Sequence, residues 1–191
     1  MYNCKTQYKD IYNMILSEIR QAIEMIDEEN IGQFVTDLCE AEKVFFIGVG
    51  RVKLSLEAFT KRLVHLGIKA CFVGDITEPA ITNKDILVVA SGSGESIVPL
   101  AIAKKAKEIG CRKIIHIGSN SNGHMKEYAD YMIRIPVRTR LYLDDEIESK
   151  QIMPSLFEQT LFIFGDIVSQ MILEKENRDI ESLWQYHANL E

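Results

Sequence analysis

The sequence predicts an α/β fold built around a doubly wound parallel sheet. Five short apolar runs carry this prediction, because each is nearly continuous rather than alternating, which is typical of strands covered on both faces. Helical stretches separate most of the runs, and this alternation favours parallel pairing. A length of 191 residues suits a single domain. The predicted strands span residues 44–48, 70–74, 86–90, 113–118 and 131–136.

Helical patterns account for segments between and around the strands. Residues 52–66 and 97–109 are the predicted helices within the core. Residues 10–28 carry apolar side chains on more than one face. Residues 156–173 are apolar nearly all round, so we expect this helix to be buried on most sides. A five-stranded sheet covers only one side of such a helix. The pattern therefore predicts that a second subunit covers the rest, which makes the protein a homo-oligomer.

The expected single domain divides into four consecutive parts. Residues 1–43 form N-terminal helices, and residues 44–136 form the sheet core. Residues 137–151 are strongly charged and are expected to form an exposed loop, and residues 152–191 supply the C-terminal helix and tail. We expect the functional residues at the carboxyl ends of the core strands, where open parallel sheets bind their ligands.

Composition excludes several classes of function. Apolar residues make up 47% of the chain and charged residues 26%, which is typical of a globular protein rather than a disordered one. The net charge of −6 argues against a nucleic-acid partner. Neither a signal peptide nor a membrane span is expected, which predicts a cytoplasmic protein. The four cysteines are widely spaced and no His/Cys cluster is present, so we expect no metal site; Cys71 and Cys111 are interpreted as buried thiols.

The first polar turn, residues 48–51, follows the first predicted strand. We expect Gly48 and Gly50 to let the backbone approach a ligand closely, at the start of a helix whose free N–H groups point to the same place. An ordinary tight turn is the simpler alternative. A dinucleotide fingerprint is a third interpretation, but Lys53 stands where its last glycine belongs.

A second polar turn follows the third predicted strand and is rich in serine. Hydroxyl and N–H groups at a helix start form a neutral anion cradle, so we favour phosphate binding here. A serine N-cap is the alternative, although one serine would suffice for a cap. The turn lacks the Gly-Lys-Ser/Thr of a nucleotide P-loop, so a simple phosphoester suits it better than ATP. The turn consists of Ser91, Gly92, Ser93, Gly94, Glu95 and Ser96. A third polar turn, residues 119–122, is interpreted as a turn and N-cap cluster that could contribute to the site rim.

Glu158 is the most informative single residue, because apolar residues flank it near the start of the C-terminal helix. A buried carboxylate has a raised pKa and suits a general base. The alternative is a first-turn glutamate that stabilises the helix dipole. Asp166 follows on the same face and is either a second inward acid or a contact between helices. Of the histidines, His116 is interpreted as a core residue and His124 as part of a polar turn.

Several motifs along the chain together match one family. The wider match rests on residues 48–51, 91–96 and 154–159, and the narrower one on residues 61–67, 155–161 and 187–191. The sequence resembles the sugar isomerase (SIS) domain family over residues 44–191 and, within it, is most similar to the 6-phospho-3-hexuloisomerases. This resemblance implies a flavodoxin-like three-layer αβα sandwich with a five-stranded parallel sheet. It also implies a homotetramer and no cofactor.

The resemblance further implies a reaction. It interconverts D-arabino-3-hexulose 6-phosphate and fructose 6-phosphate through a cis-enediol, in the ribulose monophosphate route of formaldehyde fixation. Glu158 would then be the base that moves a proton between C2 and C3. Arg51 is a candidate donor to the enediolate oxygen or to the phosphate, and His187 or His65 could move protons between the oxygens. A C-terminal histidine in such isomerases can reach a neighbouring subunit's site.

The chain departs from the family pattern at four positions. Val52 stands where serine is usual, Ala90 and Pro154 where glycine is usual, and Ser96 where threonine is usual. Two alternatives to the hexulose reaction therefore stay open. One is an isomerase of a different sugar phosphate, which the missing hydroxyl at position 52 favours. The other is a non-catalytic sugar-phosphate sensor, although no DNA-binding segment is visible.

Overall fold

A five-stranded parallel sheet forms the centre of the structure, a computed structural model that describes residues 4–190. The strand order is β2-β1-β3-β4-β5, the flavodoxin-like arrangement. Every residue of β1 and β3 is buried, as expected for strands covered on both faces. The α/β prediction is thus confirmed. The strands are β1 (Val44–Ile47), β2 (Ala70–Phe72), β3 (Ile86–Ala90), β4 (Lys113–Gly118) and β5 (Tyr131–Arg134).

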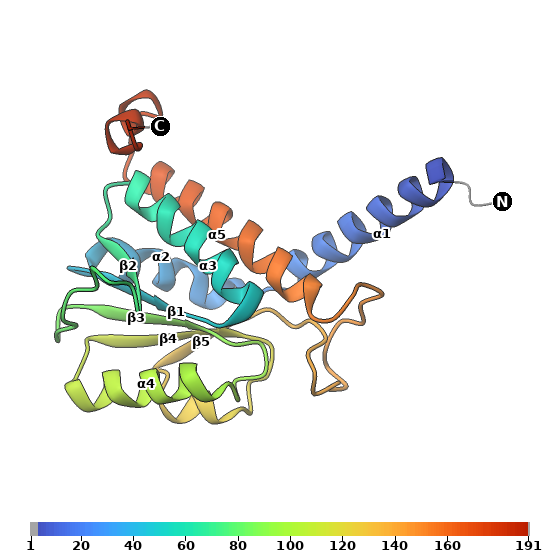
Figure 1. Ribbon diagram of the computed structural model, residues 1–191, viewed down its shortest axis with the longest axis horizontal. Helices are drawn as coiled ribbons and strands as arrows, with labels where there is room; N and C mark the ends of the chain where they lie inside the picture. Colours follow the sequence, from blue (N-terminus) through green and yellow to red (C-terminus); the bar gives the residue numbers. More distant parts are fainter. Residues whose placement is uncertain (1–3, 191) are drawn as a thin grey trace.

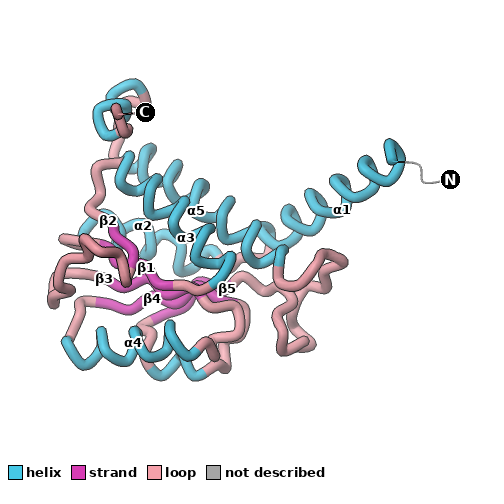
Figure 2. The backbone as a smooth tube through the Cα atoms, viewed as in Figure 1, coloured by secondary structure: helices cyan, strands magenta, loops and turns pink. Residues whose placement is uncertain are grey.

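Helices cover both faces of the sheet and give the structure three layers. Figure 1 shows α4 against one face and α2, α3 and α5 on the other, and Figure 2 shows the strands enclosed between these two layers. The α-helices are α1 (Cys4–Glu24), α2 (Ile31–Glu40), α3 (Gly50–His65), α4 (Ile97–Ile109) and α5 (Ser155–Lys175). Three short 3₁₀ helices lie between or after them: η1 (Glu28–Asn30), η2 (His124–Glu127) and η3 (Glu181–Tyr186).

The apolar helix α5 packs along α3, and more than half of its residues are buried. The two helices approach closely at Gly165, where a Cβ atom would lie 2.8 Å from Cγ of Phe59. Within the described residues, α5 alone is long and apolar enough to cross a membrane by length and composition. However, 61% of its most apolar window is buried inside the protein, as in a core helix. Phe162, Ile167 and Met171 of this helix remain exposed.

Helix α1 starts and ends earlier than the predicted helix over residues 10–28, since it spans Cys4–Glu24. Ile19 and Ala22, near its C-terminal end, are buried, and the helix packs there against α5. Its N-terminal part projects away from the body, as Figure 1 shows. Past the end of α1, the Asp27 side chain accepts a hydrogen bond from Glu29 N and caps η1, which separates α1 from α2.

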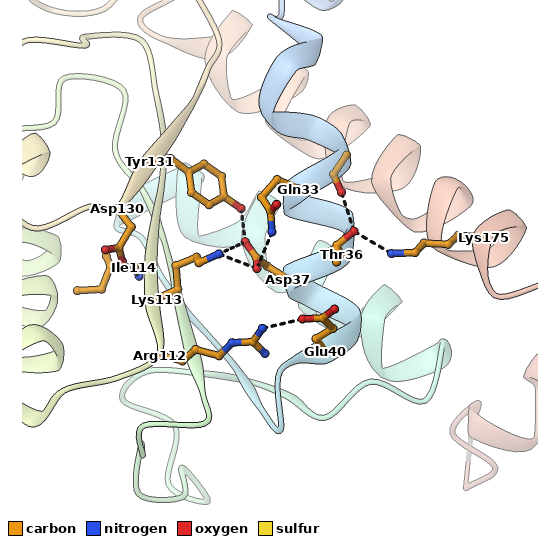
Figure 3. Close-up of polar contacts among 11 residues, drawn as sticks. Gln33, Thr36, Asp37, Glu40, Arg112, Lys113, Ile114, Asp130, Tyr131 and Lys175 are labelled. Carbon is orange, nitrogen blue, oxygen red and sulfur yellow. Dashed lines mark hydrogen bonds and ion pairs between the residues drawn. The ribbon is translucent and has the colours of Figure 1, made fainter.

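A buried polar cluster attaches α2 to the sheet at the amino ends of β4 and β5 (Figure 3). Asp37 of α2 is 1% exposed and lies 2.8 Å from Lys113 Nζ through both of its oxygens. It also accepts hydrogen bonds from the Tyr131 hydroxyl at 2.9 Å and from Gln33 Nε2 at 3.1 Å. Burial, followed by the Asp37 carboxylate, raises the pKa of Tyr131. The cluster therefore fixes α2 at the edge of the sheet opposite the carboxyl ends of the strands.

The segment from β5 to α5 is more ordered than its charge predicts. Residues 137–151, here called the strap, were expected to be an exposed loop. Instead, Val137 forms a bridge with Ile147 and both side chains are buried. Thr139 and Glu146 are also buried, at 6% and 8% exposed. The expectation was wrong for these four residues, which point inward, while most of the other charged side chains of the strap face solvent.

Candidate active site

A cavity of about 470 Å³ lies beside the point where the strand order reverses. The connections after β1 and β3 leave the sheet in opposite directions there, which opens a crevice at their carboxyl ends. The cavity walls come from the serine loop (residues 91–96), the start of α3, the strap and the start of α5. Its lining comprises Val52, Gly92, Ser93, Ser96, Arg138, Thr139, Arg140, Tyr142, Ser149, Gln151, Met153, Pro154 and Phe157.

The serine loop is held in place by its own hydroxyl groups and by the turn after β4. Ser91 Oγ donates to Ser96 Oγ at 3.1 Å, and Glu95 N donates to Ser93 Oγ at 3.3 Å. From behind, Asn120 Nδ2 donates to Ser93 O at 3.0 Å. Ser96 is the N-cap of α4 but makes no side-chain capping hydrogen bond. The first N–H groups of α4 are therefore left to a ligand, as in an anion site.

His116 supports the serine loop from β4. Its side chain is 2% exposed, and Nε2 lies 2.9 Å from Ser91 O. Because a carbonyl oxygen only accepts, Nε2 carries the proton in this contact. Burial lowers the pKa of His116 to about 4, so the ring is neutral near pH 7. The interpretation of His116 as a core residue is confirmed, and its role here is to hold the loop backbone.

Glu158 and Arg51 form an ion pair where α5 and α3 begin. Arg51 Nε lies 2.8 Å from Glu158 Oε2; the arginine side chain is 64% exposed and the glutamate residue only 8%. Burial raises the pKa of Glu158, and the nearby Arg51 charge opposes that rise without cancelling it. Ser55 Oγ donates to the Glu158 carbonyl at 2.8 Å and fixes the two helices together. The arrangement holds a carboxylate of increased basicity at the helix start.

The ion pair faces a second cavity, of about 380 Å³, rather than the first. Arg51 and Glu158 line the second cavity, whereas their sequence neighbours Val52 and Phe157 line the first. The two cavities thus lie on either side of the same two helix starts. The Glu158 carboxylate therefore lies next to the first cavity, with Val52 and Phe157 between them.

His65 and His187 lie far from this pair within one chain. His65 ends α3 while Arg51 is near its start, and fourteen residues of helix span about 21 Å. The two imidazoles stack with centroids 5.2 Å apart, and the Trp184 ring lies 5.2 Å from His187. The chain therefore brings His65 and His187 together but does not bring either to Glu158.

Of the remaining candidate residues, the glycines determine the backbone conformation, and the Glu95 side chain points away from the cavity. Gly50 has φ +59° where α3 begins, and a Cβ on Gly48 would lie 3.0 Å from a Leu56 methyl group, so both positions favour glycine. The Glu95 carboxylate accepts a hydrogen bond from His124 N at 2.9 Å and pairs with the His124 ring, so it points away from the cavity. Gly92 and Gly94 form the serine-loop backbone.

Asp166 is not an inward acid. It lies exposed on α5 and pairs with Arg62 of α3 at 3.6 Å, so it is a contact between helices, the other interpretation of this residue. The thiols of Cys71 and Cys111 are half-buried and free, and burial raises the pKa of both, that of Cys71 to about 11. Across the described part of the chain, no three His, Cys, Asp or Glu side chains gather as a metal ion would need.

Sequence reasoning missed the cavity wall that the strap supplies. Arg138, Thr139, Arg140 and Tyr142 all line the first cavity. The strap contains seven charged residues between positions 138 and 150, and this density suggested a solvated loop. Two apolar residues ten positions apart, at Val137 and Ile147, were the signal that the loop folds back on itself.

Comparisons with known proteins agree on one family. The SIS domain model matches residues 37–143. The chain is 34% identical to the 3-hexulose-6-phosphate isomerase of Bacillus subtilis over 93% of this chain and 95% of the relative. It is 33% identical to the enzyme of the same name from Mycobacterium gastri, over 94% and 89% of the two chains. A crystal structure from Methanococcus jannaschii, which was used to infer the molecular function of 3-hexulose-6-phosphate isomerase, matches with a TM-score of 0.81. That match has 32% identity and covers 95% of this chain and 99% of the other.

Proposed function

The chain belongs to the SIS domain family, and from this premise we propose that it is an isomerase of phosphorylated ketoses. The proposed substrate pair is D-arabino-3-hexulose 6-phosphate and fructose 6-phosphate, which is supported by relatives named 3-hexulose-6-phosphate isomerase that cover most of the chain. The observation that carries the proposal is a buried glutamate of raised pKa, Glu158, beside a cavity with a serine-rich anion cradle. The chain acts as a single SIS domain in the cytoplasm, in the ribulose monophosphate route.

The chemistry is a proton transfer between adjacent carbons. The Glu158 carboxylate removes the proton from C2, and the C–H electron pair forms the C2=C3 double bond while the carbonyl electrons move onto O3. The O2 proton passes to O3 of the resulting cis-enediolate. As the carbonyl then forms at C2, the electron pair of the double bond takes up at C3 the proton that Glu158 returns. A single carboxylate serves both carbons, and a base of raised pKa suits this task near neutral pH. Arg51 donates to the oxygen on which negative charge develops.

The serine loop binds the phosphate through Ser93, Ser96 and the first N–H groups of α4. These donors are neutral, and the helix dipole adds attraction for an anion. The cofactor-free reaction needs no metal, because the carboxylate and the donors complete the proton transfer between them.

The test is turnover by the purified protein. We expect fructose 6-phosphate to form from D-arabino-3-hexulose 6-phosphate, and solvent deuterium to enter C2 and C3 during the reaction. Glu158→Gln should abolish both turnover and deuterium exchange. Asp166→Asn is the matched control, because it removes a carboxylate from the exposed side of the same helix. Deuterium exchange at the wild-type rate in Glu158→Gln would remove this residue from the mechanism.

We further propose that the working unit is a homo-oligomer, with a tetramer expected. Phe162, Ile167 and Met171 are exposed apolar side chains at the margins of the outward face of α5, and a second subunit can cover them. The distance of His187 from Glu158 within one chain supports a site completed by a neighbouring subunit's histidine. Inactive Glu158→Gln and His187→Ala proteins should regain activity when they are mixed and reassembled. A mixture that stays inactive counts against a shared site.

A different phosphorylated sugar is the second candidate substrate, and Val52 favours it. This side chain lines the first cavity where the family usually supplies a hydroxyl. A screen of 3-hexulose 6-phosphate, arabinose 5-phosphate and sedoheptulose 7-phosphate separates the two candidates. Faster turnover of either alternative sugar would assign the protein to that substrate instead.

A further inference from the structure

The anion cradle of the first cavity contains no cation of its own. The serine loop contributes hydroxyl and N–H groups only, and Arg51 is paired with Glu158 in the second cavity. Among the lining residues, the positively charged side chains are Arg138 and Arg140, both on the strap. A phosphate monoester carries up to two negative charges, and charge-assisted hydrogen bonds are the strong ones. Any charged contact to a phosphate in this cavity must therefore come from the strap.

The two strap arginines differ in what they already bind. Arg138 Nη2 donates to Glu148 Oε1 at 2.6 Å, and its guanidinium lies 5.2 Å from the Tyr142 ring centroid. Within residues 4–190, Arg140 makes no hydrogen bond or ion pair, and its side chain is exposed. The pKa of Glu95, in the serine loop, is lowered chiefly by His124 and to a smaller extent by the charge of Arg140. Arg140 is thus the guanidinium available to a ligand near the serine loop.

The strap is held firmly against the serine loop beside Arg140. A Cβ on Gly92 would lie 3.2 Å from the Thr139 methyl group, so the residue before Arg140 packs directly on the loop. Buried Glu146 accepts hydrogen bonds from Thr139 N at 3.0 Å and Thr139 Oγ1 at 2.9 Å. It also accepts from Ser119 Oγ at 3.0 Å, which joins the strap to the end of β4. This carboxylate therefore fixes the backbone from which Arg140 projects.

A second carboxylate holds the other end of the strap. Glu18 of α1 accepts hydrogen bonds from Ser149 Oγ at 2.7 Å, Lys150 N at 2.9 Å and Gln151 Nε2 at 3.1 Å. With both ends attached, the strap is a preformed wall of the cavity. A preformed wall loses little conformational entropy when a ligand binds.

We propose that Arg140 makes the charged contact to the substrate phosphate from across the serine loop, and that Glu146 is the positioning residue that holds it there. This inference rests on the proposed function, since it names a residue that recognises the phosphate of that substrate. If Arg140 has this role, the strap makes the protein bind phosphorylated sugars more tightly than unphosphorylated ones.

The first test compares Arg140→Gln with Arg112→Gln, a control that removes the same charge at the opposite edge of the sheet. We expect Arg140→Gln to raise KM for the hexulose phosphate about 10- to 100-fold, with little change in kcat. The inhibition constant of inorganic phosphate should rise in parallel, and Arg140→Lys should restore part of both. If KM and the phosphate inhibition constant stay within about twofold of the Arg112→Gln values, the proposal is overturned.

The second test separates positioning from general stability. Glu146→Gln should raise KM when Arg140 is present but add little in the Arg140→Gln background, because both changes remove the same contact. Ser119→Ala, which removes one donor to Glu146, is the milder second variant should Glu146→Gln unfold. Effects on KM that multiply in the double variant would show that Glu146 acts independently of Arg140, and would overturn its positioning role.

Binding of inorganic phosphate alone distinguishes this inference from the proposed function. If the protein fails to isomerise any hexulose phosphate, the proposed function fails, while phosphate titration still tests Arg140. We expect inorganic phosphate to raise the melting temperature of the wild-type protein more than that of Arg140→Gln. Equal stabilisation of the two proteins would overturn the role of Arg140, whatever the catalytic result.

Discussion

Replacement of Asp37 by Asn should destabilise the protein by about 3 kcal/mol. The side chain keeps its shape but loses its charge beside Lys113, whose Nζ lies 2.8 Å from both carboxylate oxygens. Tyr131 and Gln33 donate to different oxygens of Asp37, so the single amide oxygen of asparagine can keep only one of these two hydrogen bonds, and the ion pair is lost as well.

The magnitude follows from burial. Asp37 is 1% exposed, and breaking a fully buried pair costs about 3–5 kcal/mol because a charge is left without a partner. The Lys113 side chain is 25% exposed and can regain part of its hydration, which places the loss at the lower end. For a chain of this size, about 3 kcal/mol corresponds to a fall in melting temperature of about 6–12 °C.

Urea unfolding followed by circular dichroism measures the change, with Glu40→Gln as the matched control. Glu40 lies on the same helix and pairs with Arg112 at 2.7 Å, but its side chain is 56% exposed, so this loss should be at most about 1 kcal/mol. If Asp37→Asn and Glu40→Gln unfold at urea midpoints that match, the buried cluster does not hold α2 to the sheet. Both folded variants should keep the wild-type kcat, since the cluster lies at the amino ends of the strands.

Three further predictions concern pH, packing and thiol reactivity. Because burial raises the pKa of Glu158, its carboxyl keeps a proton to higher pH than a free glutamate. The value of kcat/KM should therefore rise with pH through a midpoint above 4.5, and a midpoint at or below 4.5 would contradict its role as the base. Gly165→Ala places a Cβ 2.8 Å from Phe59 and should cost about 1–3 kcal/mol in urea unfolding. Gly32→Ala, where a Cβ meets nothing within 4 Å, should leave stability unchanged or raise it. The pKa of Cys71 is raised to about 11, so its alkylation by iodoacetamide should be slow at neutral pH and accelerate with each pH unit up to that value; rapid alkylation at pH 7 would refute the raised pKa.

The sheet could be predicted from the sequence because a buried strand is recognisable by its apolar local composition. The runs over residues 86–90 and 113–118 coincide with β3 and β4, since a strand covered on both faces must be apolar along its length. The serine loop and Glu158 could be found for a related reason. Polar residues interrupting an apolar context stand out, and the carboxyl edge of a parallel sheet brings such turns together.

The strap and the two histidines could not be placed by the same reasoning. Thr139 and Glu146 are buried by contacts with each other and with Ser119, which is 27 positions before Glu146, and no local pattern encodes such a partner. The positions of His65 and His187 depend on the length and direction of α3, which carries them away from the helix start. Local patterns thus reveal which residues are unusual, whereas their partners depend on topology.

The overall charge of −6 does not reveal the local charges around the two cavities, where two of the three arginines are paired with carboxylates. Arg51 is neutralised by Glu158 and Arg138 by Glu148, so neither guanidinium contributes a free positive charge in this state. Arg140 is left uncompensated by any ion pair within the described residues, beside donors that carry no charge. At physiological salt, charges more than about 8 Å away are largely screened, so the distant acidic surface opposes an incoming phosphate only weakly. Phosphate affinity should therefore depend on one local guanidinium and on the backbone that holds it, far more than on the sign of the whole chain.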